Sequence, residues 1–496
     1  MSRRNHDRGL SRRDALKLGA GMAALSLHAA AQDKPAAISK TIGIQVGAVS
    51  FVDEGTDRVL DIVQEKGNVN TIFLAAFTYG RGIGGRQVPG QPLPDHGRQA
   101  YDPEFFGGNF ATPHPQFYHG TVLQDTKAPD HGKLDIVEEV LPKAHKRGMK
   151  VYCWYEDVFN AKVPNLQKLA EVDLNGRRAS TLCAYNPDYK NFLIALTEDY
   201  CKSYDIDGVM WGCERQGPFN NMLGSRHGGL PDPSKATCFC EFHQAEAKER
   251  GIDVQRAMQG FRRLEAFVKR AIANDRPSDG YFVEFWRILL EFPEILAWQK
   301  MWTDGTQQIY GDIYGAAKSS RPSVQAGFHI WHNNSFSPFY RAEQNYETLS
   351  NVSDYLKIVV YNNCGGPRYA AYANTVANTL WHDVPAEELL RFNNYLMNYD
   401  EKGLGDIPTA GLSSDYVYRE TKRALAGVDG ACKIYPGIDI DIPTGDKEKK
   451  TSPEDVHGAT AAALKAGADG VIFSRKYSEM RLANLEAGGK AVRDFA

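Results

Sequence analysis

Eight short apolar runs, separated by stretches with helical periodicity, constrain the fold of this chain more than any other feature. The runs cover residues 41–49, 70–77, 149–157, 206–212, 323–331, 355–363, 431–440 and 468–477. Continuous apolarity is typical of strands that are buried on both faces of a parallel sheet. Eight such strands alternating with helices predict an α/β fold of the (β/α)8 or TIM barrel type. A doubly wound open sheet is the alternative, but no glycine-rich fingerprint follows the first run.

Two departures from a minimal barrel are visible in the spacing of these runs. A long loop rich in Gly, Pro and His follows the second predicted strand, over residues 78–130. An enlarged helical region, residues 253–319, separates the fourth and fifth predicted strands. The chain contains no internal repeat or linker, so we expect residues 40–496 to form a single catalytic barrel domain with this helical region as an extension.

The N-terminal residues 1–31 are predicted to be a twin-arginine signal peptide. Arg12 and Arg13 precede a mildly apolar stretch, and the small residues 29–31 provide a cleavage site. This signal predicts export by the twin-arginine (Tat) machinery to the periplasm or beyond. No run of about 18 apolar residues follows, so we expect no membrane span in the mature chain.

The amino-acid composition limits the classes of molecule that the protein is expected to bind. The formal net charge is -3, which argues against a nucleic-acid binder because such proteins carry a basic excess. Aromatic residues make up 11% of the chain, which suits stacking against sugar rings as well as filling a large core. A carbohydrate is therefore the expected partner, and the sequence leaves the oligomeric state open.

Acidic residues follow three of the predicted strands. In a barrel, the residues just beyond the strand ends converge on one mouth, where active sites lie. Glu156 follows the third strand, Glu214 the fourth, and Asp439 ends the seventh. Cleavage of a glycosidic bond needs one protonated carboxyl and one ionised carboxylate. We expect Glu214 to be the acid, Asp439 to face it across the barrel, and Glu156 to be the reserve.

Aromatic and polar residues at the same strand ends are candidates for substrate binding. Aromatic rings stack on sugar faces, and cationic or amide groups bind hydroxyls or a carboxylate. The predicted stacking residues are Trp154, Trp211, Trp331 and Tyr361. The predicted polar contacts are Arg215, His329, Asn362 and Arg475.

A short cysteine and histidine motif follows the fourth strand. Cys238, Cys240 and His243 could hold three corners of a zinc tetrahedron, with Cys213 or Cys183 as the fourth ligand. A disulfide from Cys213 to Cys238 or Cys240, or free thiols, is the other interpretation. Any zinc here would be structural, and no cofactor is expected for catalysis.

Two segments carry a resemblance to known proteins. "GCERQGPF", followed by "CFCEFHQAEAKERGID", is similar to the layout of the family 42 β-galactosidases among the retaining barrel glycosidases. Residues 40–496 also resemble secreted bacterial proteins called hypothetical glycosyl hydrolases, in segments such as "VVYNNCGGPR" and "GVIFSRKYSEM". The resemblance implies a barrel glycosidase, with Glu214 as acid/base and a structural zinc near Cys238.

The chain departs from family 42 at two positions. The residue before the acid is Cys213 where the family has Asn, and the strand-seven nucleophile is Asp439 or Asp441 where the family has Glu. A shorter carboxylate widens the gap between the two groups and favours inversion. Galactosidase activity is therefore not implied.

Two further function classes stay open. One is a carbohydrate-binding barrel that has lost catalysis. The other is a metal-dependent hydrolase of another substrate, with His329, His332, His382 and Asp383 as ligands. The absence of an H-x-H motif after the first strand disfavours the metal-dependent class.

Overall fold

Eight parallel strands close into a barrel in the computed structural model, which describes residues 40–86, 94–98 and 102–496. Residues Lys40–Ala496 form one compact unit. The predicted signal peptide, residues 1–31, lies outside the described residues. Within the described part of the chain, no helix combines the length and apolarity needed to cross a membrane.

Each of the eight predicted runs contains one barrel strand, which confirms the predicted fold class. The strands follow the order of the chain around the barrel, and the first strand pairs with both the second and the last. They are β1 (Thr41–Gly47), β2 (Thr71–Thr78), β4 (Lys150–Glu156), β7 (Gly208–Gly212), β8 (Gln325–Ile330), β9 (Tyr355–Val359), β10 (Lys433–Asp439) and β11 (Gly470–Ser474). Short predicted runs and observed strands differ by only a few residues at their ends.

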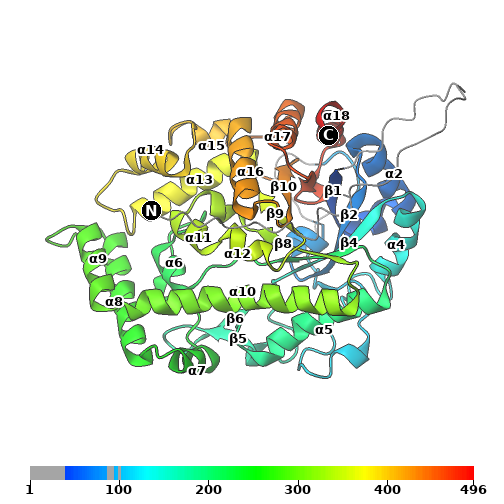
Figure 1. Ribbon diagram of the computed structural model, residues 1–496. Coiled ribbons are helices and arrows are strands. Elements are labelled where there is room, and N and C mark those ends of the chain that lie inside the picture. Colours follow the sequence, from blue (N-terminus) through cyan, green and yellow to red (C-terminus); the bar gives the residue numbers. More distant parts are fainter. Residues whose placement is uncertain (1–39, 87–93, 99–101) are drawn as a thin grey trace, which may run out of the picture. The chain divides into compact units, whose positions relative to one another are not determined.

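Helices cover the outside of this barrel (Figure 1). They include α2 (Thr56–Gly67), α4 (Ile136–Lys146), α5 (Pro187–Ser203), α13 (Asn362–Ala377), α16 (Ser414–Val428), α17 (Pro453–Lys465) and α18 (Leu482–Phe495). Of these, α4, α13, α16 and α17 contact the barrel strands directly. The side chain of Asp135 caps α4 by accepting hydrogen bonds from two backbone amides of the first turn, as an N-cap residue should.

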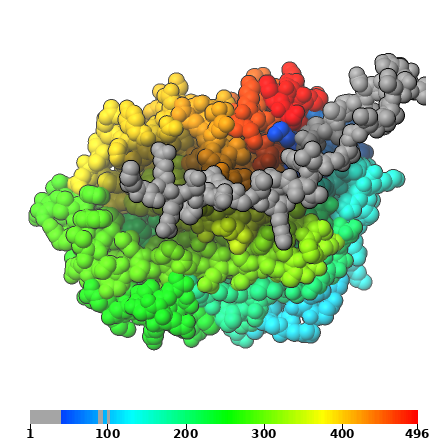
Figure 2. All heavy atoms as spheres, in the orientation of Figure 1, coloured from blue at the N-terminus to red at the C-terminus, as the bar shows by residue number. Residues whose placement is uncertain are grey.

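The predicted helical region between the fourth and fifth strands is present as three helices. They are α8 (Val254–Ile272), α9 (Tyr281–Glu291) and α10 (Glu294–Ser320). Figure 1 shows α10 running past the barrel toward α8, and it contacts both β8 and α5. In Figure 2, the green surface of this region meets the yellow surface of the segment around α14 (Ala386–Met397), and the rings of Phe282 and Trp381 stack there at 4.8 Å.

The long segment after β2 contains little regular structure in its described part. It forms the short helix α3 (Arg81–Gly84) and the two-residue strand β3 (Gly108–Asn109), which pairs antiparallel with β2. Beyond β4, a small hairpin of β5 (Ala170–Val172) and β6 (Arg178–Leu182) lies outside the barrel. This hairpin and the end of β4 are parts of the wall of the candidate site.

Aromatic rings fill the lower half of the barrel. Tyr152, Tyr355 and Tyr435 point inward from three strands, with ring centroids 5.6 and 5.1 Å apart in succession. Glycines on neighbouring strands make room for these rings. A β-carbon at Gly327 would lie 2.4 Å from the ring of Tyr355, well inside van der Waals contact.

We therefore expect Gly327→Ala to destabilise the barrel by about 1 to 3 kcal/mol, because an added methyl group must displace a packed ring. Gly311→Ala is the matched control, since Gly311 lies within α10 and a β-carbon there meets nothing within 4 Å. Alanine in a helix interior should leave stability unchanged or raise it by up to about 1 kcal/mol. Thermal and urea unfolding monitored by circular dichroism measure both, and equal effects would contradict the ring-packing explanation.

Candidate active site

A cavity of about 260 Å³ opens at the carboxyl ends of β4 and β7. Its lining residues are Trp154, Glu156, Asp157, Val158, Phe159, Ser180, Thr181, Gly212, Glu214, Arg215 and His329. Pockets that enclose drug-sized ligands measure about 300 to 1,000 Å³. The cavity is therefore suited to one small ring or a short group, and it brings together five residues that the sequence predicts for the site.

Glu214 follows β7, and its side chain keeps 54% of its surface accessible. His329 of β8 holds it, because the imidazole Nε2 lies 2.8 Å from the Glu214 Oε1 atom. Partial desolvation at the cavity wall acts to raise the pKa of Glu214, but the hydrogen bond from His329 and nearby positive charge, including Arg368, lower it to about 2. Glu214 is thus ionised across the ordinary pH range.

Lys357 holds the other side of the same imidazole. It points into the barrel from β9, is completely buried, and its Nζ lies 3.3 Å from His329 Nδ1. The ammonium also donates to Gln45 Oε1 at 2.6 Å and to the Tyr361 hydroxyl at 3.0 Å. Three N–H bonds therefore meet three acceptors, and His329 is left with its proton on Nε2, facing Glu214.

Burial lowers the pKa of Lys357 to about 7, while the charges of Glu214 and Glu156 act to raise it. Burial and the charge of Lys357 also lower the pKa of His329, so this imidazole is a neutral donor toward Glu214. The sequence analysis missed Lys357. Its signal is a single lysine in the middle of a continuously apolar run, since such a residue must find partners inside the barrel.

Glu156 ends β4 and lines the same cavity as Glu214. In the register of β4 against β7, Glu156 pairs with Gly212, two positions before Glu214. The Thr78 hydroxyl donates to Glu156 Oε2 at 2.6 Å. Burial raises the pKa of Glu156 to about 7, and the charge of Glu214 acts in the same direction. One cavity thus holds one ionised carboxylate and one carboxyl that keeps its proton up to neutral pH.

Asp439 does not face this cavity, contrary to the sequence-based expectation. Its side chain has no exposed surface, and its two oxygens accept hydrogen bonds from the backbone amides of Cys364 and Ile442, each at 2.9 Å. These bonds tie the end of β10 to the start of α13. The residue was predicted to face Glu214 because it ends a strand, but its carboxylate is used to satisfy buried amides.

Arg215 belongs to the cavity wall, where it is engaged by two carboxylates. Its guanidinium pairs with Asp157 at 2.5 Å and with Glu171 at 3.2 Å, and it donates to the Leu182 carbonyl. It therefore joins the end of β4 to the β5–β6 hairpin. This arrangement fixes the wall more than it offers a free donor to a substrate.

The two predicted tryptophans of β4 and β7 point in opposite directions. Trp154 lines the cavity, and its buried Nε1 has no hydrogen-bond partner among the described residues. Trp211 is fully buried on the outer side of the barrel, where its ring meets Tyr310 of α10 edge-on at 5.2 Å. The prediction that Trp211 stacks on a sugar is therefore wrong, because side chains alternate along a strand and Trp211 packs under a helix.

The remaining predicted binding residues lie around the mouth and are mostly engaged. Trp331 is buried and packs edge-on against Tyr340. Tyr361 accepts from Lys357, and Arg475 pairs with Glu479 at 2.5 Å. Asn362 lines a different cavity, of about 490 Å³, between α13 and α17. None of these four lines the cavity of Glu214.

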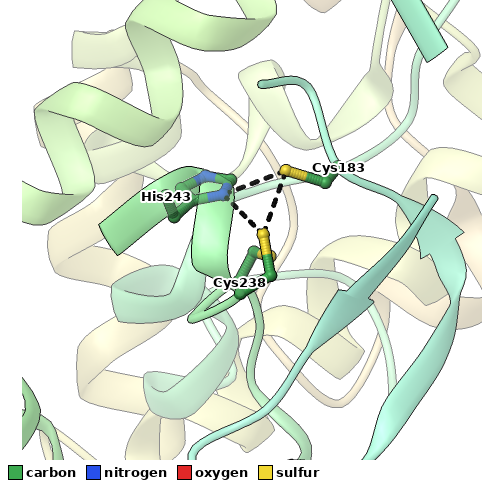
Figure 3. Close-up of side chains that lie close together, drawn as sticks. Cys183, Cys238 and His243 are labelled. Atoms are coloured by element: carbon green, nitrogen blue, oxygen red, sulfur yellow. Dashed lines mark hydrogen bonds between the residues drawn. The ribbon is translucent and has the colours of Figure 1, made fainter. Parts of the chain in front are cut away.

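Four buried side chains form a cluster beside the hairpin (Figure 3). Cys183, Cys238, Cys240 and His243 place one sulfur or nitrogen each within 4.8 Å of one another. Cys183 Sγ lies 3.1 Å from His243 Nδ1 and 3.4 Å from Cys240 Sγ. The sequence left Cys183 and Cys213 open as the fourth member. The structure selects Cys183, because the Cys213 thiol is directed to Asp157 instead, at 3.3 Å.

Tetrahedral zinc with Zn–S bonds of about 2.3 Å separates its ligand atoms by about 3.8 Å. The spacing and the three-sulfur, one-nitrogen donor set therefore fit zinc. The four histidine and aspartate residues considered for a catalytic metal do not converge: His332 contacts Arg368 and Tyr416, while His382 contacts Asn274. Among the described residues, the cysteine cluster is the one group with metal-ligand spacing.

No family model matches the chain, and no curated protein matches it. Among solved structures, a β-galactosidase from the Antarctic haloarchaeon Halorubrum lacusprofundi superposes with a TM-score of 0.52 at 13% identity, over 92% of this chain and 58% of that one. An α-L-fucosidase isoenzyme from Paenibacillus thiaminolyticus gives 0.49 at 12% identity, over 92% and 49%. The chain thus spans about half the length of these two proteins.

The glycoside hydrolase domain of PgaB from Bordetella bronchiseptica gives a TM-score of 0.46 at 12% identity, over 88% of this chain and 94% of that one. The likeness to the β-galactosidase, with a TM-score of 0.52 at 13% identity, shows a shared fold. The barrel that the glycosidase resemblance implied is therefore confirmed, while the activities named for these proteins remain theirs.

The raised pKa of Glu156 has a consequence for stability. An ionised Glu156 is disfavoured in the folded chain, so its contribution to folding falls as the pH rises from about 4.5 to about 7. Glu156→Gln stays neutral and should be more stable than the wild type above pH 7, by about 3 kcal/mol at 1.36 kcal/mol per pKa unit. Near pH 4.5 the free energies of unfolding of Glu156→Gln and the wild type should be about equal.

Unfolding midpoints measured from pH 4.5 to 9 test this expectation, with Glu65→Gln on the exposed face of α2 as the control. A constant difference between Glu156→Gln and the wild type at all pH values would contradict a raised pKa.

Proposed function

We propose that this protein is a glycoside hydrolase that uses Glu156 and Glu214 as its carboxyl pair. The observation that carries the proposal is the placement of both groups in one cavity with pKa values of about 7 and about 2. Glycosidic cleavage requires this division between a proton donor and an ionised group. Barrel neighbours named as a β-galactosidase and an α-L-fucosidase support the same class.

The proposed roles differ from the sequence-based expectation, in which Glu214 was the acid. Glu156 keeps its proton at neutral pH and gives it to the oxygen of the leaving group as the glycosidic bond breaks. Glu214, held ionised by His329, attacks the anomeric carbon or removes a proton from the attacking water. If Glu214 attacks, the glycosyl ester on its carboxylate is hydrolysed by a water whose proton goes to Glu156. If Glu214 instead takes a proton from the attacking water, it releases that proton to solvent and Glu156 takes one up. The chemistry is carried by the chain's own carboxyls.

Other cavity residues suit the binding of one sugar ring. Trp154 offers an aromatic surface and an unpartnered N–H, and Ser180 and Thr181 add hydroxyls at the hairpin side. Phe159 contributes a second ring to the wall. Aromatic rings beside polar and charged groups suit a sugar, since the rings cover its apolar faces and the polar groups bind its hydroxyls.

Substitution of either carboxyl tests the proposal. With 4-nitrophenyl glycosides, Glu214→Gln should lose nearly all turnover, and Glu156→Gln should lower kcat/KM by about 10² to 10⁴. The wild type should lose activity as the pH rises through about 7, where Glu156 gives up its proton, and this limb should be absent in Glu156→Gln. A better leaving group, such as 2,4-dinitrophenolate, should narrow the defect of Glu156→Gln because it needs less protonation.

Glu65→Gln is again the control, and it should keep wild-type kinetics. A wild type that binds sugars but hydrolyses none of a broad panel of aryl glycosides and oligosaccharides would favour the non-catalytic carbohydrate-binding barrel over a hydrolase. Full activity in Glu214→Gln would reject the assignment of that residue.

We further propose that Cys183, Cys238, Cys240 and His243 bind a structural zinc ion. The four donor atoms support this through their mutual spacing and burial. A zinc ion would join the β6–α5 connection to the start of α7 (Glu241–Glu249), two segments that border the site wall. The twin-arginine motif at residues 11–17 supports a second proposal, export of the folded chain to the periplasm or beyond.

Elemental analysis tests the zinc proposal. We expect about one zinc per chain in the wild type and in Cys432→Ser, which removes a buried cysteine outside the cluster. Cys240→Ser should lose most of the metal, and chelation should lower the melting temperature of the wild type but not of the variant. Zinc-free wild type with a mass 2 Da below the reduced chain would indicate a disulfide instead.

A further inference from the structure

Arg368, at the mouth of the barrel, has no carboxylate partner among the described residues. Arg368 lies half-buried on α13, the helix that follows β9. Within the described residues, no carboxylate oxygen lies within 4.0 Å of its guanidinium, whereas Arg215, Arg475 and Arg481 at neighbouring strand ends each form an ion pair. A partly buried guanidinium without a counter-charge is costly unless something else pairs with it.

A buried histidine holds Arg368 in place. Nη1 of Arg368 lies 3.1 Å from Nδ1 of His332, which is completely buried. On its other side, His332 Nε2 lies 3.2 Å from the Tyr416 hydroxyl, which donates to Ser335 Oγ at 2.8 Å. Because Nδ1 accepts from the arginine, His332 carries its proton on Nε2, and the whole row is satisfied with a neutral imidazole.

The rest of the guanidinium stays available. An arginine has five N–H donors in a planar fork, and the hydrogen bond to His332 uses one of them. A chain of contacts joins the Arg368 guanidinium to the candidate catalytic groups. His332, which holds Arg368, packs its ring edge-on against Tyr361 at 5.5 Å, and Tyr361 accepts a hydrogen bond from Lys357. Arg368 is also close enough to Glu214 to lower its pKa, although the two do not form an ion pair.

A third group beside Arg368 has an open polar atom. The ring of His227 lies 6.2 Å from that of His332 and 5.4 Å from that of Trp331, and its buried Nε2 has no partner among the described residues. Burial and the charge of Arg368 lower the pKa of His227 to about 3, so this imidazole is neutral. The mouth therefore combines one fixed cation with a neutral, unpartnered imidazole.

We propose that Arg368 binds the carboxylate of an acidic sugar, so that the substrate of this barrel carries a uronic acid unit next to the bond that is cleaved. A planar carboxylate matches the fork of a guanidinium in a bidentate pair, and a neutral sugar does not. This inference rests on the proposed glycosidase function, and it adds the class of sugar to it.

Paired substrates test the inference. The wild type is assayed with α- and β-linked 4-nitrophenyl D-glucuronide and D-galacturonide, with the corresponding glucosides and galactosides, and with the uncharged methyl esters of the uronides. We expect kcat/KM for the preferred uronide to exceed that of its neutral counterpart and its methyl ester. In Arg368→Gln this preference should fall by about 10- to 150-fold, the range for a hydrogen-bonded charged group.

Two controls separate the inference from general damage. Arg226→Gln removes an exposed arginine of the adjoining loop and should keep the preference. Arg368→Lys keeps the charge without the fork and should retain only part of it. The inference requires a change in the ratio of kcat/KM for the uronide to kcat/KM for its neutral counterpart. An equal loss on both substrates would indicate a structural effect through Glu214.

The outcomes also separate this inference from the proposed function. Hydrolysis of neutral glycosides with no preference for uronides would overturn the acidic-sugar assignment and leave the glycosidase standing. If no glycoside is cleaved, titration calorimetry of the wild type with D-glucuronate and D-glucose decides the inference alone. Binding of glucuronate that is lost in Arg368→Gln supports it, and equal or absent binding of both sugars overturns it.

Discussion

The candidate site depends on one buried ammonium group. Lys357 enters a barrel interior that is otherwise filled by aromatic rings, and its three N–H bonds meet Gln45, His329 and Tyr361. A buried cation is tolerated only when its donors are satisfied, and this requirement orients each acceptor. The tautomer of His329 follows from it, and with that tautomer comes the donor that keeps Glu214 ionised. Removing Lys357 would release three groups at once.

Charges around the mouth fall into two sets with different physical roles. In the first set, Arg215, Arg475 and Arg481 are tied to carboxylates of nearby loops, so they hold the loops at the strand ends in place. In the second set, Glu156 and Arg368 have no oppositely charged partner within an ion-pair distance among the described residues. Buried or half-buried groups of this kind are unfavourable for folding alone, and they are common where a ligand completes the pairing.

Much of the fold could be predicted because buried parallel strands are continuously apolar and short, and each barrel strand coincides with one such run to within a few residues. The cavity was harder to predict. Glu156, Glu214 and His329 follow or end strands and do meet, but Asp439 obeys the same rule and is used by backbone amides. The direction of a side chain at a strand end depends on register and on the loop beyond, which one sequence does not specify. Trp154 and Trp211 differ for that reason.

The cysteine and histidine cluster shows the same limit. Cys238, Cys240 and His243 are neighbours in the chain, so the motif is visible in the sequence. Cys183 lies more than fifty positions earlier, and only the path of the hairpin brings it to the others. Lys357 and Arg368 were missed for a different reason, since a lone cation in an apolar run and another within a helix carry no spacing pattern. Lys357 is important because of the three acceptors around it, and Arg368 because no carboxylate of the described residues pairs with it.

The packed tyrosine rings beneath Lys357 determine how a ligand can enter and leave the barrel. Tyr152, Tyr355 and Tyr435 close the barrel below the lysine, so the interior has no passage to its opposite end. Among the described residues, a ligand of the cavity must therefore enter and leave the barrel on the side of Glu214. A polysaccharide could therefore reach the cavity only from this side, either by lying across the mouth or by inserting a chain end.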